Sequence, residues 1–186
     1  MHEALLALLA SHPPADAQEA ADLERMRVAA RSLAAPLSRS QPEAHFTASA
    51  VVVSPDGARV ALIHHGKLHR WLQPGGHVEE SDGGELAEAA LREAREETGL
   101  AVHLHPQAPR PLDVDAHVIP ARREDAAHTH LDVRFLLIAA DPAALQHDTA
   151  ESHAAQWFGW DEALAKADEP ALSRMLHKAR ALCERR

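Results

Sequence analysis

The segment from Trp71 to Leu100, WLQPGGHVEESDGGELAEAALREAREETGL, constrains the fold more than any other part of the chain. Its second half is rich in alanine and glutamate, and its apolar residues recur with the period of an amphipathic helix. Gly99 is the residue type that most easily adopts the left-handed conformation at the end of a helix, so the helix is expected to stop there. Pro74, Gly75 and Gly76 precede the helix as a tight turn, where glycine lets the backbone approach a ligand closely.

Three carboxylates gather on one face of this predicted helix. With about 3.6 residues per turn, Glu96 and Glu97 lie within about 60° of Glu93 around the axis. Like charges at this spacing destabilise a helix by a few tenths of a kcal/mol per pair. A hard divalent cation, Mg²⁺ or Mn²⁺, would offset the repulsion, because it binds carboxylate oxygens and keeps waters or substrate phosphates as its other ligands. The simpler alternative is a solvated helix face, in which Arg92 pairs with Glu88 and Glu96.

The residues from Arg92 to Leu100, together with Gly76, resemble the Nudix box, G-x5-E-x7-R-E-U-x-E-E-x-G-U, where U is an apolar residue. All nine C-terminal positions of the box match. The middle departs from the pattern. A spacer of five residues separates Gly76 from Asp82, where the pattern has glutamate, and a spacer of nine residues then separates Asp82 from Arg92. Glu85 is the alternative first carboxylate, with spacers of eight and six residues. The departure indicates a two-residue insertion in this loop, and either residue fits the first acidic position.

The resemblance implies a metal-dependent hydrolase that cleaves a pyrophosphate bond in a nucleoside diphosphate linked to another moiety. It implies that Mg²⁺ or Mn²⁺ is bound by Glu93, Glu96, Glu97 and the backbone carbonyl of Gly76. It also implies catalytic roles for Glu93, Arg92 and Glu96: Glu93 would bind metal or accept the proton of the attacking water, and Arg92 would orient a glutamate by charge-assisted hydrogen bonds.

A further carboxylate from outside the box, such as Glu151, occurs in enzymes of this kind. Two other functions share the resemblance. One is a noncatalytic Nudix-like module that senses a nucleotide, but such modules usually lose box glutamates, and this chain has all three. The other is an isopentenyl-diphosphate isomerase-like enzyme, which needs a cysteine in its site, whereas the single cysteine here, Cys183, lies in the last predicted helix.

The composition limits the partners and the compartment. The net charge is −9 with histidine neutral, which argues against binding to nucleic-acid backbones or anionic membranes. A small-molecule nucleoside diphosphate derivative is the expected partner. A single cysteine excludes an intrachain disulfide and is typical of the reducing cytoplasm.

Residues 1–44 are expected to form an N-terminal helical extension, and residues 45–186 the Nudix hydrolase domain. The extension is predicted as two helices, the second capped by Asp16 and ending near Leu33. This hairpin could pack on the domain, cover the active site or form the interface of a homodimer.

Short strands interleave with the central helix and a C-terminal helix that begins at Pro170, which predicts an α/β/α sandwich with a mixed β-sheet, as the resemblance also implies. A short helix capped by Asp161 is expected before the last one. Strands are predicted at Thr47–Val53, Ala58–His65, Gly76–Glu79, Ala101–His105, residues 113–118, residues 128–135 and Ala154–Trp160.

Two of these strands place histidines and aspartates on one face. Such alternation most often marks the solvated side of a half-exposed sheet. The competing hypothesis is a substrate pocket, in which Arg134 contacts a phosphate or carboxylate and His77, His128 and His130 contact hydroxyl groups or a base. A third option is a transition-metal site built from His128 and His130, for which the spacing offers no third ligand.

Overall fold

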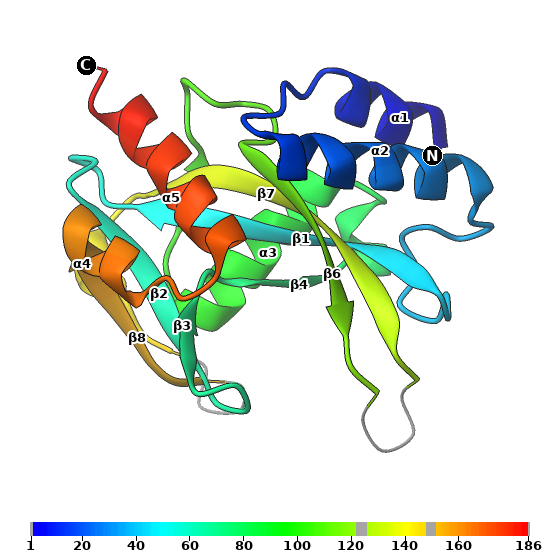
Figure 1. The fold of residues 1–186 in the computed structure, drawn as a ribbon. Helices are drawn as coiled ribbons and strands as arrows, with labels where there is room; N and C mark the ends of the chain where they lie inside the picture. The colour runs from blue at the N-terminus through cyan, green and yellow to red at the C-terminus, as the bar shows by residue number, and fades with distance from the viewer. Residues whose placement is uncertain (1, 122–125, 148–151, 186) are drawn as a thin grey trace.

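A computed structural model describes residues 2–121, 126–147 and 152–185 of the 186-residue chain. An eight-stranded mixed sheet lies between two layers of helices (Figure 1). This is the predicted α/β/α sandwich. The helices are α1 (His2–Ala10), α2 (Ala17–Ser32), α3 (Leu86–Thr98), α4 (Trp160–Lys166) and α5 (Pro170–Cys183). The strands are β1 (Ala44–Val53), β2 (Arg59–His65), β3 (Arg70–Leu72), β4 (Gly75–His77), β5 (Val102–Leu104), β6 (Asp113–Ile119), β7 (His128–Ala139) and β8 (Ser152–Gly159).

Strand β1 is the centre of the sheet. Along its whole length it pairs in parallel with β7, which in turn pairs antiparallel with β5 and β6. On its other edge, the middle of β1, Thr47 to Ser49, pairs with β4, and only Val52 and Val53 pair with β2. Strands β2, β3 and β8 therefore diverge from β6 and β7, as Figure 1 shows.

Two hydrophobic clusters lie between the sheet and the helices, one on each face of the sheet. Because successive side chains of a strand point to opposite faces, Ala48 and Ala50 pack in the cluster that contains α3, α1 and α2. Val51 and Val53 pack in the second cluster, with α4 and α5. The two clusters place α3 and the α5 layer on opposite faces of the sheet.

The N-terminal hairpin packs on the rest of the protein. Asp16 caps α2 by accepting a hydrogen bond from the backbone N–H of Glu19 at 2.7 Å, as predicted. Helix α2 crosses the first part of β6 (Figure 1), where the carboxylate of Glu19 accepts from the N–H of Val114 at 3.2 Å. Arg25 also donates to the backbone carbonyl of Ala116, at 3.4 Å. The side chains of α2 thus satisfy backbone groups of β6 that no strand pairs.

The prediction that Asp161 caps a helix is wrong. Helix α4 begins at Trp160 with Gly159 in the cap position, so Asp161 lies within the first turn. Its carboxylate instead accepts a hydrogen bond from Arg180 of α5 at 2.7 Å. Among the described residues, no helix combines the length and apolar character that crossing a bilayer requires.

Candidate active site

Helix α3 carries the carboxylates that the sequence singles out. It ends as predicted at Gly99, whose φ of 67° is left-handed and whose N–H donates to the carbonyl of Arg95 at 2.9 Å. Ala90, Leu91 and Ala94 are buried against the sheet. This packing fixes the rotation of the helix and turns the glutamate face toward β4.

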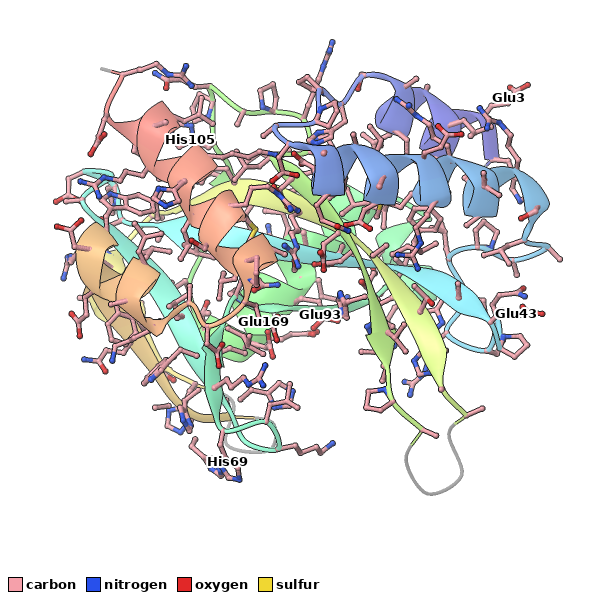
Figure 2. All side chains as sticks on the ribbon, in the orientation of Figure 1. Glu3, Glu43, His69, Glu93, His105 and Glu169 are labelled. Carbon is pink, nitrogen blue, oxygen red and sulfur yellow. The ribbon has the colours of Figure 1, made fainter. Side chains whose placement is uncertain are left out.

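The three glutamates differ in how deeply they lie. Glu97 is buried, and its Oε2 accepts a hydrogen bond from the backbone N–H of Gly75 at 2.8 Å. The side chain of Glu93 is 14% exposed and that of Glu96 is 56% exposed. A Cβ on Gly76 would lie only 2.5 Å from Oε1 of Glu93, so any larger residue there would displace this carboxylate from its position. In Figure 2, Glu93 lies between the two diverging groups of strands.

Arg92 links these carboxylates to the turn before the helix. Its Nε and Nη2 atoms each lie 3.0 Å from one oxygen of Asp82, which is a bidentate pair. Nη1 donates to Glu93 at 3.0 Å and to Glu96 at 2.9 Å, and Nη2 also donates to the backbone carbonyl of His77 at 2.8 Å. The hydrogen bond with Asp82, followed by those with the two glutamates, raises the pKa of Arg92 above its ordinary value.

Of the two candidates for the first acidic position of the box, Asp82 is the one that contacts Arg92. Its Oδ2 also accepts a hydrogen bond from the N–H of Glu79 at 2.8 Å. Burial alone would raise the pKa of Asp82, but the hydrogen bonds from Arg92 and Glu79 outweigh it and lower the pKa. Glu85 occupies the cap position of α3 without a side-chain hydrogen bond to the helix.

Comparison with known families agrees with this geometry. The NUDIX domain model matches residues 44–179, which is well over half of the chain. The chain belongs to the NUDIX family. The enzyme class expected from the sequence, a Nudix-type pyrophosphohydrolase, is confirmed by this membership. None of the curated proteins matches the chain significantly.

Solved structures of Nudix proteins share the fold. A NUDIX-family hydrolase from Clostridium perfringens superimposes with a TM-score of 0.53 at 24% identity, covering 75% of this chain and 96% of that one. A binary complex of the C. elegans Ap4A hydrolase superimposes with a TM-score of 0.52 at 20% identity, covering 75% of this chain and 97% of that one. At this level of identity, the likeness shows a common fold.

The aspartate part of the histidine- and aspartate-rich face of β6 and β7 is buried, so its interpretation as a solvated face is wrong there. His128 and His130 are half-buried, and the side chain of His117 is 42% exposed. Asp113 and Asp132 are 0% and 4% exposed. Arg134, at 2% exposure, lies 3.5 Å from Asp113, 3.0 Å from Asp115 and 2.8 Å from Asp132. This face packs against the α5 layer, where Arg174 pairs with Asp113 at 2.9 Å. Arg134 therefore neutralises buried carboxylates of its own sheet, which contradicts its expected role as a phosphate ligand.

At the far end of the same face, the predicted histidines lie together with one that the sequence did not suggest. The rings of His77 and His130 lie 5.2 Å apart between centroids, and each lies near His45 of β1, at 5.1 and 4.9 Å. Burial, then the neighbouring histidines, lowers the pKa of His77 to about 4 and that of His130 to about 3, so both are neutral at pH 7. Sequence reasoning missed His45 because it lies 85 residues before His130, and only the pairing of β1 with β7 brings the two together.

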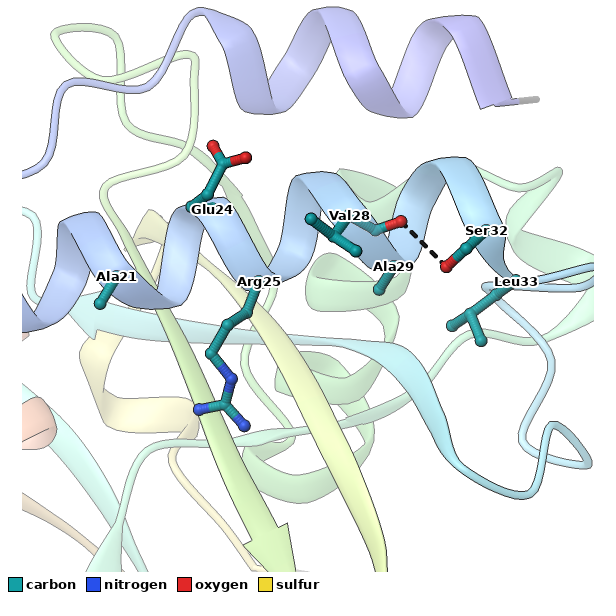
Figure 3. A pocket seen from close by; sticks show the side chains of 7 residues that line it. All are labelled: Ala21, Glu24, Arg25, Val28, Ala29, Ser32 and Leu33. Atoms are coloured by element: carbon teal, nitrogen blue, oxygen red, sulfur yellow. Dashed lines mark hydrogen bonds between the residues drawn. The ribbon is translucent and has the colours of Figure 1, made fainter.

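The described surface also carries an open pocket along α2, drawn in Figure 3. It is lined by Glu24, Arg25, Val28 and their helical neighbours, and it contains no box carboxylate. The loop carboxylate considered from the sequence, Glu151, lies outside the described residues.

Proposed function

We propose that this Nudix protein uses Mg²⁺ or Mn²⁺ to hydrolyse a pyrophosphate bond in a nucleoside diphosphate linked to another moiety. The observation that carries the proposal is the position of Glu93 and Glu97 against Gly75 and Gly76 of β4. Arg92 is bonded both to Glu93 and to the carbonyl of His77 in the same strand. The absence of a side chain at Gly76 leaves space for the carboxylate of Glu93, rather than for an apolar side chain of the core.

The phosphorus of a pyrophosphate is shielded by negatively charged oxygens, so water attacks it slowly. We propose that Glu93, Glu96, Glu97 and the carbonyl of Gly76 hold the divalent ion, since this all-oxygen set suits Mg²⁺ and Mn²⁺. A bound divalent ion neutralises the phosphate charge and lowers the pKa of water.

The protein's own residues then position the reaction. The N–H of Gly75 fixes one oxygen of Glu97, so that this carboxylate needs no reorganisation during the reaction. Arg92 fixes Oε1 of Glu93, the residue that we propose accepts the proton of the attacking water. Glu96 is the most exposed of the three and reaches solvent, from which the substrate enters. His77, the next residue of β4, turns its ring to the histidine group on the opposite face of the sheet, and its contact with the substrate stays a prediction.

The experiment is hydrolysis by purified protein with Mg²⁺ and then Mn²⁺. The substrates are ADP-ribose, Ap4A, nucleoside triphosphates, coenzyme A and sugar nucleotides; Ap4A belongs in the panel because the C. elegans Ap4A hydrolase shares the fold. Glu97→Gln should lower turnover by a factor of roughly 100 or more, because it removes several kcal/mol of charge stabilisation. Glu88→Gln, an exposed change on the same helix, is the matched control and should leave turnover unchanged.

Turnover by Glu97→Gln close to that of the wild type would refute the assignment. Absence of hydrolysis across the panel, with Mg²⁺ binding intact, would favour the nucleotide-sensing alternative. A cytoplasmic location and a homodimer remain predictions.

A further inference from the structure

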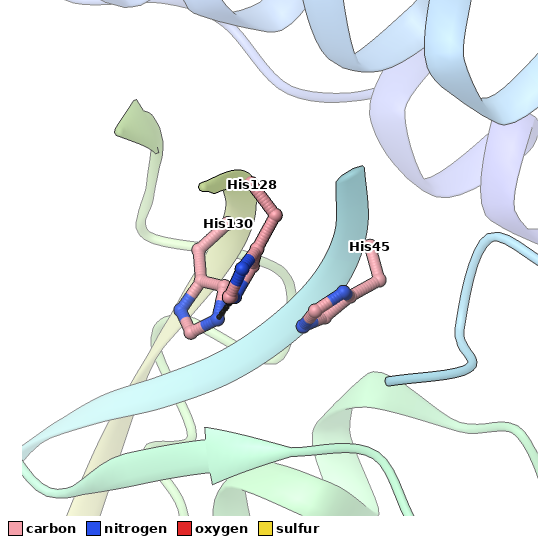
Figure 4. Close-up of side chains that lie close together, drawn as sticks. All are labelled: His45, His128 and His130. Atoms are coloured by element: carbon pink, nitrogen blue, oxygen red, sulfur yellow. Dashed lines mark hydrogen bonds between the residues drawn. The ribbon is translucent and has the colours of Figure 1, made fainter. Parts of the chain in front are cut away.

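We propose that His45, His128 and His130 form a transition-metal site, of the kind that binds Zn²⁺, on the face of the sheet opposite α3. The register of the sheet brings the three residues together. His45 of β1 lies directly beside His130 of β7, and His128 precedes His130 by two residues on the same face. One ligand nitrogen from each ring can be chosen so that all three lie within 4.8 Å of one another. Figure 4 shows the ring of His45 facing the other two.

The distances suit a tetrahedral ion. Nε2 of His128 accepts a hydrogen bond of 3.2 Å from Nε2 of His130, and a metal ion would replace this bond once the proton of His130 lies on its Nδ1. Two nitrogens bound to Zn²⁺ at 2.0–2.1 Å in tetrahedral geometry are about 3.3–3.4 Å apart. These two ligands are therefore almost in place, and only His45 has to approach them more closely.

The hydrogen bonds at Nδ1 of His128 and His45 determine which nitrogen of each ring carries the lone pair. Nδ1 of His128 lies 2.9 Å from the carbonyl of Ala126, and Nδ1 of His45 lies 3.4 Å from the carbonyl of Gln41. A carbonyl only accepts, so in each neutral ring Nδ1 carries the proton and Nε2 carries the lone pair. Metal-binding histidines in proteins commonly have their second nitrogen fixed by a carbonyl in this way.

His45 supplies an independent observation. Its side chain is buried at 2% exposure, yet within the described residues its Nε2 has no hydrogen-bond partner. Leaving a buried polar atom unsatisfied is unfavourable, so native proteins rarely do so without a reason. A metal ion at the centre of the three rings gives that nitrogen its partner.

The donor set separates this site from the carboxylate site on α3. Three imidazoles suit Zn²⁺ and other transition metals, whereas Mg²⁺ prefers oxygen ligands. Three protein ligands also leave a fourth position for water or another small ligand. The sheet lies between the two sites: Gly76 faces Glu93 of α3, and the next residue, His77, contacts the histidine group with its ring.

The test measures Zn²⁺ alone, with the full chain free of any polyhistidine tag and stripped by a chelator. We expect one Zn²⁺ per chain by elemental analysis after dialysis, and a dissociation constant from competition with a chromogenic chelator. His128→Gln and His130→Gln should each weaken binding by about 100-fold, at or beyond the upper end of the loss seen for residues that only support a ligand. Melting curves establish that each variant folds.

Two control variants locate the ion. His153→Gln alters an exposed histidine that stacks on His69 with centroids 5.7 Å apart, in a second group of rings outside the proposed site. Glu97→Gln alters the carboxylate site. Both should retain Zn²⁺ with wild-type affinity. Zinc lost in Glu97→Gln but kept in His128→Gln and His130→Gln would overturn the proposal.

X-ray absorption of the zinc-loaded wild type is a second measurement that needs no variant. We expect three nitrogen ligands at about 2.0–2.1 Å. A spectrum with oxygen ligands alone, or wild-type protein that binds no Zn²⁺, would refute the site even if a histidine variant failed to fold.

Discussion

The carboxylate of Glu19 is expected to hold the N-terminal hairpin to the rest of the protein. It is fully buried on α2, and it accepts hydrogen bonds from His12 at 2.7 Å, from the N–H of Ala15 at 2.6 Å and from the N–H of Val114 at 3.2 Å. Lys178 of α5 donates to the same carboxylate. One side chain therefore joins the hairpin, the edge of β6 and the C-terminal helix.

Replacing Glu19 by alanine removes the acceptor and leaves these donors buried. Breaking a buried ion pair by removing one partner costs about 3–5 kcal/mol where the other charge stays uncompensated. Lys178 keeps Asp113 as a second partner at 2.9 Å, so this range is an upper bound. That is a large share of the 5–15 kcal/mol that typically separates folded from unfolded protein. For a chain of this size, 1 kcal/mol lowers the melting temperature by about 2–4 °C, so the upper bound corresponds to a shift of about 6–20 °C.

Urea unfolding followed by circular dichroism measures this free energy. The control is Glu24→Ala on the same helix, where the carboxylate is 62% exposed and lies 3.7 Å from Arg27. Such an exposed pair should contribute less than about 1 kcal/mol. A loss in Glu19→Ala no larger than that in Glu24→Ala would refute the role given to the buried carboxylate.

Three more outcomes follow from the geometry. Burial alone would raise the pKa of Glu19, but the hydrogen bonds from His12 and Lys178 outweigh it and lower the pKa below the unfolded value of about 4.3. Its contribution is therefore complete above that pH and is lost as the pH falls, so urea titrations should show wild type and Glu19→Gln converging below about pH 5. Gly76→Ala should abolish turnover with little change in melting temperature, because the new Cβ meets the flexible end of Glu93 at 2.5 Å. Gly75→Ala should lower the melting temperature, because its Cβ meets the backbone of Ser49 at 2.6 Å. Equal melting curves for the two variants would contradict this difference. Arg92→Lys keeps the charge but loses the bidentate pair with Asp82, so turnover should fall about tenfold or more, and unchanged kinetics would exclude an orienting role.

Local patterns predicted the part of the site that is local in sequence. The helix that ends at Gly99, the glutamate face and the two glycines all lie within one stretch of 30 residues, so their spacing alone places them together. The same holds for the helix capped by Asp16. The glycines were expected in a tight turn, but they belong to strand β4, which pairs with β1. Seven of the eight described strands were predicted to within a few residues, because alternation and turn residues mark them. Strand β3, Arg70–Leu72, was not predicted, because three residues are too few to show alternation.

Long-range pairing set the limits of sequence reasoning. Alternation shows that Asp113, Asp132 and Arg134 lie on one face of their strands, but not what covers that face. The positive charges that stabilise these buried aspartates come partly from other parts of the chain, such as Arg174 of α5. His45 was missed for the same reason, because only the parallel pairing of β1 with β7 brings it to His130.

The packing of α2 against β6 affects how this protein can be shortened. The family match begins at residue 44, so a chain trimmed to that match would lack α2. The outer edge of the seven-residue strand β6 would then present unpaired N–H and C=O groups. Such an edge is a template for another strand, and a second copy of the trimmed chain offers one that is identical. We expect the trimmed protein to associate with itself through β6 and to precipitate as its concentration rises.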